Sequence, residues 1–254
     1  VLFRSEPAFH LAVKHYEAAA AVGQSDAQVY EGIAEVWIRQ VEMRSSRSQS
    51  VEVAYAAAIA ASDKLISSEP ESIAGPLKKA SAAAVMAGGV GRQTNAARIE
   101  QCLRDSHAVL RRQPDHPYAS ELAALCYQDA AQEAQQRGQD PEPLLRKGID
   151  LLEPVVKNNP HFLWGINDLA INYVFLGVYQ LLHGQATGRE LLERSISGYM
   201  AAAQLDPTYE KAFSNMLDVY GRIIELLPSD LEVKKYGPSD CRMGSQLCDG
   251  MGIE

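Results

Sequence analysis

The chain has 254 residues, which is enough for one large domain or two small ones with a hydrophobic core of ordinary size. It carries 24 Lys and Arg against 32 Asp and Glu, and a net charge of −8 argues against a nucleic-acid partner, because phosphate binding needs a basic surface. Apolar runs fall short of the roughly 20 residues of a membrane helix, so we expect no membrane span. An alanine-rich composition with few aromatic residues predicts an all-α protein.

Both ends of the chain depart from the pattern of the rest. The chain has no initiator Met, and its first five residues are what translation of a common sequencing adapter would give, so we expect residues 1–7 to be a truncated end of artefactual origin. Beyond Pro228 the helical periodicity is lost and glycines recur, which predicts a poorly ordered tail over residues 228–254. We therefore expect a fragment of a longer protein.

Proline closes a helix at four regularly spaced points, because it cannot extend a helix and forces the preceding residue out of the helical region. These residues, Pro70, Pro114, Pro160 and Pro207, are separated by 44, 46 and 47 residues. The same spacing places the end of an earlier unit near Gln24. Repeats of this length are typical of stacked helical hairpins. In chain order we expect a single repeat domain, 8–227, with units at 8–24, 25–70, 71–114, 115–160, 161–207 and 208–227.

Equivalent positions of the units carry residues of similar size. Twelve residues before each closing position stand Ala12, Ala58, Cys102, Gly148 and Ser195. Ten residues after each closing position stand Ala34, Ala80, Ala124, Ala170 and Leu217, and three residues later Trp37, Ala83, Tyr127, Tyr173 and Tyr220. Small residues where helices approach closely, next to aromatic residues that fill the adjoining space, are typical of packed hairpins.

These positions resemble the tetratricopeptide repeat (TPR). The fourth unit matches best, with Ile166, Leu169, Ala170 and Tyr173 in its first helix and Ser195, Tyr199, Ala202 and Pro207 in its second. The second unit is degenerate, and each unit is about ten residues longer than the usual 34. The resemblance implies an all-α, right-handed α-solenoid of stacked helical hairpins.

The four cysteines match neither a disulfide framework nor the paired spacing of a zinc site. A reducing compartment is the simpler interpretation, and it predicts a cytoplasmic protein. We expect Cys102 and Cys126 to lie on facing helices of one hairpin as small core residues rather than as a redox pair.

No catalytic or metal-binding motif accompanies the repeat. The six histidines show no paired ligand spacing, and no local motif surrounds a Ser or Cys nucleophile. The Gly-rich stretch 88–92 lacks the Lys-Ser/Thr ending of a phosphate-binding loop. We expect a protein that is not an enzyme and that needs no cofactor.

The concave face is the candidate binding site, because the first helix of each hairpin lines it in such repeats. By register, the candidate groove residues are Glu31, Glu35, Tyr118, Glu121, Asp129, Trp164, Asn167, Phe175, Lys211, Asp218 and Arg222. Aromatic groups beside carboxylates suit a basic, amphipathic peptide or helix. The alternative is that Trp164, Ile171 and Phe175 only pack against neighbouring helices.

These features predict a protein–protein interaction module that belongs to a larger signalling protein. A second hypothesis comes from the segment 138–145, Gly-Gln-Asp-Pro-Glu-Pro-Leu-Leu, which resembles repeats found C-terminal to bacterial serine/threonine kinase domains. That resemblance implies the regulatory C-terminal region of such a kinase, whose catalytic domain is missing from this chain.

Overall fold

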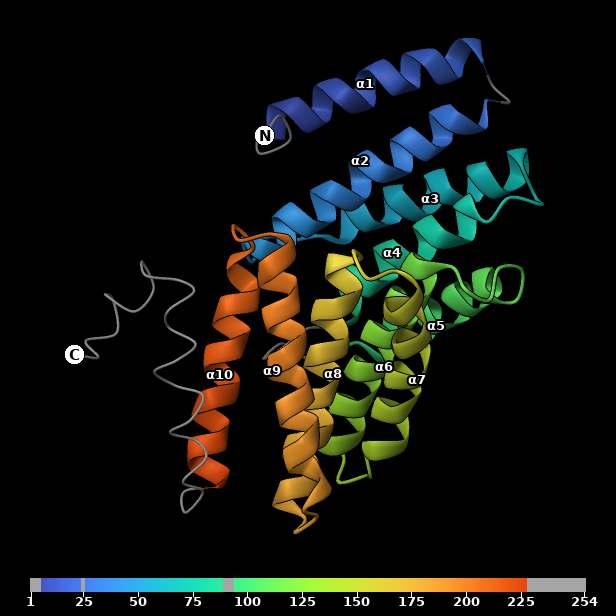
Figure 1. Ribbon diagram of the computed structural model, residues 1–254. Coiled ribbons are helices and arrows are strands. Elements are labelled where there is room, and N and C mark those ends of the chain that lie inside the picture. The colour runs from blue at the N-terminus through green and yellow to red at the C-terminus, as the bar shows by residue number, and fades with distance from the viewer. Residues whose placement is uncertain (1–5, 24–25, 89–93, 228–254) are drawn as a thin grey trace. The chain divides into compact units, whose positions relative to one another are not determined.

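The computed structural model describes residues 6–23, 26–88 and 94–227, which form ten α-helices and no strand (Figure 1). The predicted all-α class is confirmed. Among these residues no helix is both long enough and apolar enough to cross a membrane. The expected artefactual residues 1–5 and the expected tail 228–254 lie outside the described residues, whereas Glu6 and Pro7 form part of the first turn of α1.

The helices are between 14 and 20 residues long. Their bounds are α1 Glu6–Val22, α2 Ala27–Ser46, α3 Glu52–Ser68, α4 Ala74–Ala87, α5 Ala96–Leu110, α6 Pro117–Gln136, α7 Glu142–Asn158, α8 Leu163–Leu182, α9 Thr187–Leu205 and α10 Glu210–Leu226. The prolines that the sequence analysis singled out follow the ends of α3, α5, α7 and α9.

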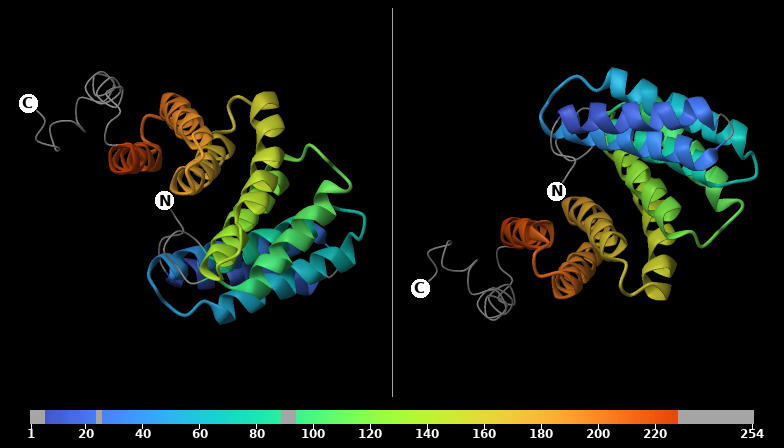
Figure 2. Two further views of the ribbon diagram at one scale, coloured as in Figure 1. Left: turned by 90° about the horizontal axis from the view of Figure 1, so that it is seen from below. Right: turned by 90° about the horizontal axis from the view of Figure 1, so that it is seen from above.

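The chain divides into two compact units, Val1–Asn159 with α1 to α7 and Pro160–Glu254 with α8 to α10. In the first unit, helices α2–α3, α4–α5 and α6–α7 form hairpins, and the first helices also contact one another, α2 with α4 and α4 with α6. In the second unit α8 and α9 form a hairpin, and α10 contacts both helices (Figure 2). In helical-repeat proteins the first helix of one hairpin contacts the first helix of the next hairpin, as α2, α4 and α6 do here.

The turn that follows the first helix has the same geometry in three hairpins. Ser48, Gly138 and Gly184 adopt positive φ angles of 54°, 72° and 74° after α2, α6 and α8. In each turn the next residue donates its N–H to the carbonyl five residues earlier, which is the Schellman arrangement that closes a helix. The bonds run from Gln49 to Arg44, from Gln139 to Ala134 and from Gln185 to Gln180. The units therefore repeat the backbone conformation of this turn as well as the pattern of residue types.

The small residues that recur in the sequence lie where helices meet. Ala34, Ala80, Ala124 and Ala170 on the first helices are fully buried, as are Ala58, Cys102 and Ser195 on the second helices. Leu217, the equivalent residue of α10, is 38% exposed. Among the described residues no helix follows α10, so no next hairpin covers this position.

The predicted role of the cysteines is wrong. Cys102 of α5 and Cys126 of α6 form a disulfide, with an Sγ–Sγ distance of 2.04 Å and 6.4 Å between their Cα atoms. The two helices belong to consecutive hairpins, not to one. The spacing of 24 residues matches no short cysteine motif, because the pair is brought together by the stacking of hairpins.

Candidate functional site

The candidate groove residues fall into two sets, one in each unit. Those of the first unit lie on α2 and α6, and those of the second unit lie on α8 and α10. Each set is described by itself.

On α2, both candidate carboxylates meet cations of the chain itself. The Nζ of Lys78, on α4, lies 2.8 Å from Glu35 and 3.6 Å from Glu31, and Arg39 also bonds Glu35 at 2.8 Å. Burial alone would raise the pKa of Glu35, but the hydrogen bond and charge of Lys78, helped by Arg39, hold it below its ordinary value. This surface therefore offers a basic partner much less free negative charge than the sequence suggests.

On α6, the three candidate residues have different surroundings. Tyr118 is 47% exposed near the start of the helix, and Glu121 is half-buried. Asp129 is only 6% exposed, and its carboxylate lies against Gly88 at the end of α4, so closely that a Cβ on this glycine would be 2.9 Å from Asp129 Oδ1. Asp129 is thus part of the interior, and its predicted role as a charge on the groove surface is wrong.

In the second unit, one row of α8 presents large apolar side chains. Trp164, Ile171 and Phe175 are separated by seven and four residues, which places them on one side of the helix. Trp164 is 51% exposed, whereas Ile171 and Phe175 are half-buried. Asp168 lies in the same row and is buried; the sequence analysis missed it, although its spacing of four from Trp164 indicates its place.

Asn167 is a structural residue and not a surface one. It is 3% exposed, it accepts a hydrogen bond of 3.2 Å from Asn215 Nδ2 on α10, and it donates one of 3.1 Å to Asp168. Its amide therefore joins α8 to α10, and the prediction that it faces a partner is wrong. Asn215 was not singled out in the sequence, although it lies between Lys211 and Asp218 on the same row of α10.

The remaining candidates, Lys211, Asp218 and Arg222, are exposed along α10. Arg222 Nε donates a hydrogen bond of 2.9 Å to Asp218 Oδ2. Their spacing of seven and four residues repeats that of Trp164, Ile171 and Phe175 on α8, the helix that α10 contacts. We call these two rows the α8–α10 face; it combines a partly exposed aromatic row with a charged row.

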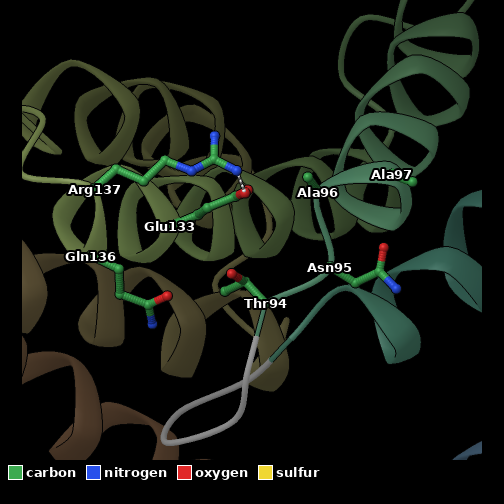
Figure 3. Close-up of a pocket in the computed structure, with 7 residues that line it drawn as sticks. All are labelled: Thr94, Asn95, Ala96, Ala97, Glu133, Gln136 and Arg137. Carbon is green, nitrogen blue, oxygen red and sulfur yellow. Dashed lines mark hydrogen bonds and ion pairs between the residues drawn. The ribbon is translucent and has the colours of Figure 1, made fainter.

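A polar pocket of about 460 Å³ lies where α5 begins and α6 ends (Figure 3). Its lining consists of Thr94, Asn95, Ala96, Ala97, Glu133, Gln136 and Arg137. Arg137 is paired with Glu133, and Asn95 caps α5 by accepting a hydrogen bond from the N–H of Arg98. Small-molecule sites are lined mainly by apolar and aromatic groups, so this pocket is not a candidate for one. Among the described residues no group of three His, Cys, Asp or Glu is placed to hold a metal ion.

No protein-family model and no curated protein sequence matches the chain. Among solved structures, a thermophilic TPR protein from Thermus thermophilus is similar, with a TM-score of 0.50, 15% identity, and coverage of 74% of this chain and 91% of that protein. A monomeric mutant of IFIT1 in complex with m7Gppp-AAAA is also similar, with a TM-score of 0.53 and 12% identity. That match covers 88% of this chain but only 47% of IFIT1. The chain therefore has a TPR-like, all-α helical-repeat fold, as its sequence predicted.

Proposed function

We propose that the chain is a non-catalytic protein–protein interaction module, and that the α8–α10 face of the second unit binds a peptide or a helix. The observation that carries this proposal is Trp164, which is 51% exposed on α8, the helix that contacts α10 with its exposed charged row. Partly exposed aromatic residues are the usual anchors of protein interfaces, because they bury a large apolar area on binding. The TPR-like fold supports the same conclusion, since helical repeats provide extended surfaces for protein partners.

The partner that fits this face carries an apolar anchor and mixed charge. The expectation of a basic partner rested on carboxylates that include Glu31, Glu35, Glu121 and Asp129. Glu31 and Glu35 are paired within the chain, Glu121 is half-buried and Asp129 is buried. On α10, Asp218 and Arg222 already pair with each other. Their charges should therefore affect the register of a bound peptide and its association rate more than its affinity. An amphipathic peptide with a large apolar side chain against Trp164 is the partner that we propose.

RNA is the alternative that the comparison with IFIT1 introduces, because that protein is seen with m7Gppp-AAAA. The net charge of −8 and the ion pairing of Lys78, Arg39 and Arg222 argue against it, since an RNA backbone requires unpaired cations along its path. We therefore propose a protein partner. The kinase hypothesis remains a sequence-based alternative, and a catalytic domain upstream of residue 6 in the full gene would support it.

The experiment is a selection of helical peptides on the intact chain, followed by affinity measurements on two matched variants. Trp164→Ala removes the proposed anchor, whereas Leu182→Ala removes an apolar side chain that is 61% exposed at the end of the same helix. We expect Trp164→Ala to weaken binding by roughly tenfold or more and Leu182→Ala to leave it unchanged. Peptides that bind both variants equally, or a capped oligonucleotide that binds in place of the peptides, would contradict the proposal.

A further inference from the structure

The disulfide between Cys102 and Cys126 lies at a joint of the repeat. Cys102 belongs to α5, the second helix of one hairpin, and Cys126 belongs to α6, the first helix of the next. Both side chains are completely buried. The bond therefore connects two consecutive hairpins of the first unit through its interior.

Around the disulfide, the non-covalent packing of this joint relies mainly on small side chains. The buried cluster around the disulfide contains, besides the two cysteines, Ala83, Ala87 and Ile99, with Ala84, Leu103 and Ala130 packed against it. A second buried cluster on α5 and α6 consists of Val109, Leu110, Ala119 and Ala123. By contrast, the cluster shared by α8, α9 and α10 contains Val174, Leu192, Ile196, Tyr199, Val219 and Ile223. Because apolar stabilisation grows with the area removed from water, the alanine-rich cluster contributes much less.

Unsatisfied polar groups weaken the same two helices further. Ser106 Oγ on α5, and Ser120 Oγ and Gln128 Oε1 on α6, are buried and have no hydrogen-bond partner among the described residues. Each such atom has lost its bonds to water without replacement, which lowers the stability of the fold around these two helices. The joint is also held by the cluster of Val109 and Leu110 and by a hydrogen bond of 2.8 Å between His107 Nε2 and the Tyr127 hydroxyl, and the covalent bond adds to these contacts.

We infer that the Cys102–Cys126 bond reinforces the joint between hairpins α4–α5 and α6–α7, and that the first unit reaches its native stability only where thiols are oxidised. Formation of the bond removes two electrons and two protons from the two thiols, and an oxidised dithiol protein or glutathione disulfide accepts them. A buried disulfide persists in oxidising compartments and is rare where thiols are kept reduced. This inference replaces the sequence-based expectation of a cytoplasmic protein.

Opening of this joint would also expose a buried carboxylate. Asp129 lies one turn beyond Cys126 on α6 and packs against Gly88 at the end of α4. Separation of α4–α5 from α6–α7 would expose its carboxylate and break the contact between the first helices α4 and α6. Reduction would thus open the first unit at one defined joint and leave the second unit unchanged.

The test combines a thiol count with hydrogen exchange on the full chain. Alkylation under denaturing conditions without reductant should leave Cys102 and Cys126 unmodified in protein made in an oxidising compartment. With dithiothreitol present, or in Cys102→Ala/Cys126→Ala, amides of α4 to α7 should exchange at least tenfold faster, while those of α8 and α9 should not change. Cys241→Ala/Cys248→Ala is the matched control and should behave as the wild type.

A third variant guards against a simple failure of folding. Cys102→Val/Cys126→Ala fills the space without a bond, and it should recover part of the protection while becoming insensitive to dithiothreitol. The inference is overturned if the natively folded chain, once denatured without reductant, is alkylated at both Cys102 and Cys126. It is equally overturned if reduction leaves exchange in α4 to α7 unchanged, or if chain made in a reducing cytoplasm shows full protection with free thiols.

Discussion

Gly177 of α8 and Gly188 of α9 face each other so closely that neither position has room for a side chain. A Cβ on Gly188 would lie 2.4 Å from the carbonyl oxygen of Gly177, and a Cβ on Gly177 would lie 2.8 Å from that of Gly188. The obstacle in both cases is backbone, which cannot rotate away as a flexible side chain could. The close contact of the α8–α9 hairpin therefore depends on both glycines.

The first prediction is that Gly188→Ala destabilises the second unit by about 1–3 kcal/mol, because the helices must separate to admit the methyl group. Gly221→Ala is the matched control: a Cβ there meets nothing within 4 Å, and alanine favours a helix over glycine by up to about 1 kcal/mol. Urea unfolding of both variants gives the comparison. Equal stability of the two variants would show that the hairpin relaxes freely.

The second prediction concerns Tyr173, which is 4% exposed under the guanidinium of Arg194. Arg194 also donates a hydrogen bond to the Tyr173 hydroxyl, and its Cζ lies 4.2 Å from the ring centroid. Tyr173→Ala should cost about 3–5 kcal/mol through loss of the buried ring, and Tyr173→Phe about 1 kcal/mol through loss of the hydrogen bond. Tyr118→Ala, at an exposed position, should change stability by less than about 0.5 kcal/mol. A small effect of Tyr173→Ala in urea melts would contradict the described packing.

The third prediction is an acid dependence that comes from Glu35 and Lys78. The pKa of Glu35 lies below 4.5 in the folded chain, so its contribution to stability is present above that pH and is lost as the pH falls through the folded value. Lys78→Met removes the main partner and should flatten the fall in stability between about pH 5 and pH 3. Lys157→Met, at an exposed position of α7, is the control, and its pH profile should follow the wild type in urea melts.

The fourth prediction concerns His116, which caps α6 by accepting a hydrogen bond of 3.2 Å from the N–H of Ala119. Burial lowers the pKa of His116 below 6.5, against a smaller opposing effect of its backbone hydrogen bond. Because the folded pKa is depressed, protonation favours the unfolded chain, and stability falls as the pH drops below about 6.5.

The measurement compares the wild type with His116→Asn, which keeps a capping side chain that does not titrate. Stability between pH 7 and pH 5 should fall less in the variant than in the wild type. The pKa of His107 is also lowered, by burial and by Arg111 and Lys147, and it remains in both proteins. The difference between the two profiles therefore isolates His116, and identical profiles would contradict its role.

The sequence predicted the features of the fold that depend on local periodicity. Recurring small residues such as Ala80, Ala124 and Ala170 indicated helix contacts, and all three are buried at such contacts. The four prolines likewise indicated helix ends, because the restriction that proline places on the backbone is local.

Features that depend on neighbouring helices could not be predicted in the same way. Asn167 and Trp164, three residues apart, lie only about 60° apart around the helix, yet Asn167 is buried and Trp164 is exposed. Asn167 meets Asn215 of α10, and Asp129 meets Gly88 of α4, and neither contact is visible in one helix alone. The disulfide was missed for the same reason, since only the stacking of hairpins brings Cys102 to Cys126.

The two tryptophans of the chain lie in different units, Trp37 in the first and Trp164 in the second. Trp37 packs against buried residues of three neighbouring clusters, whereas Trp164 is half-exposed, so their indole rings experience environments of different polarity. Each unit thus carries its own fluorophore. Emission from Trp37→Phe and Trp164→Phe reports separately on the two units, and reveals whether heat or denaturant disrupts them in one cooperative event or in two.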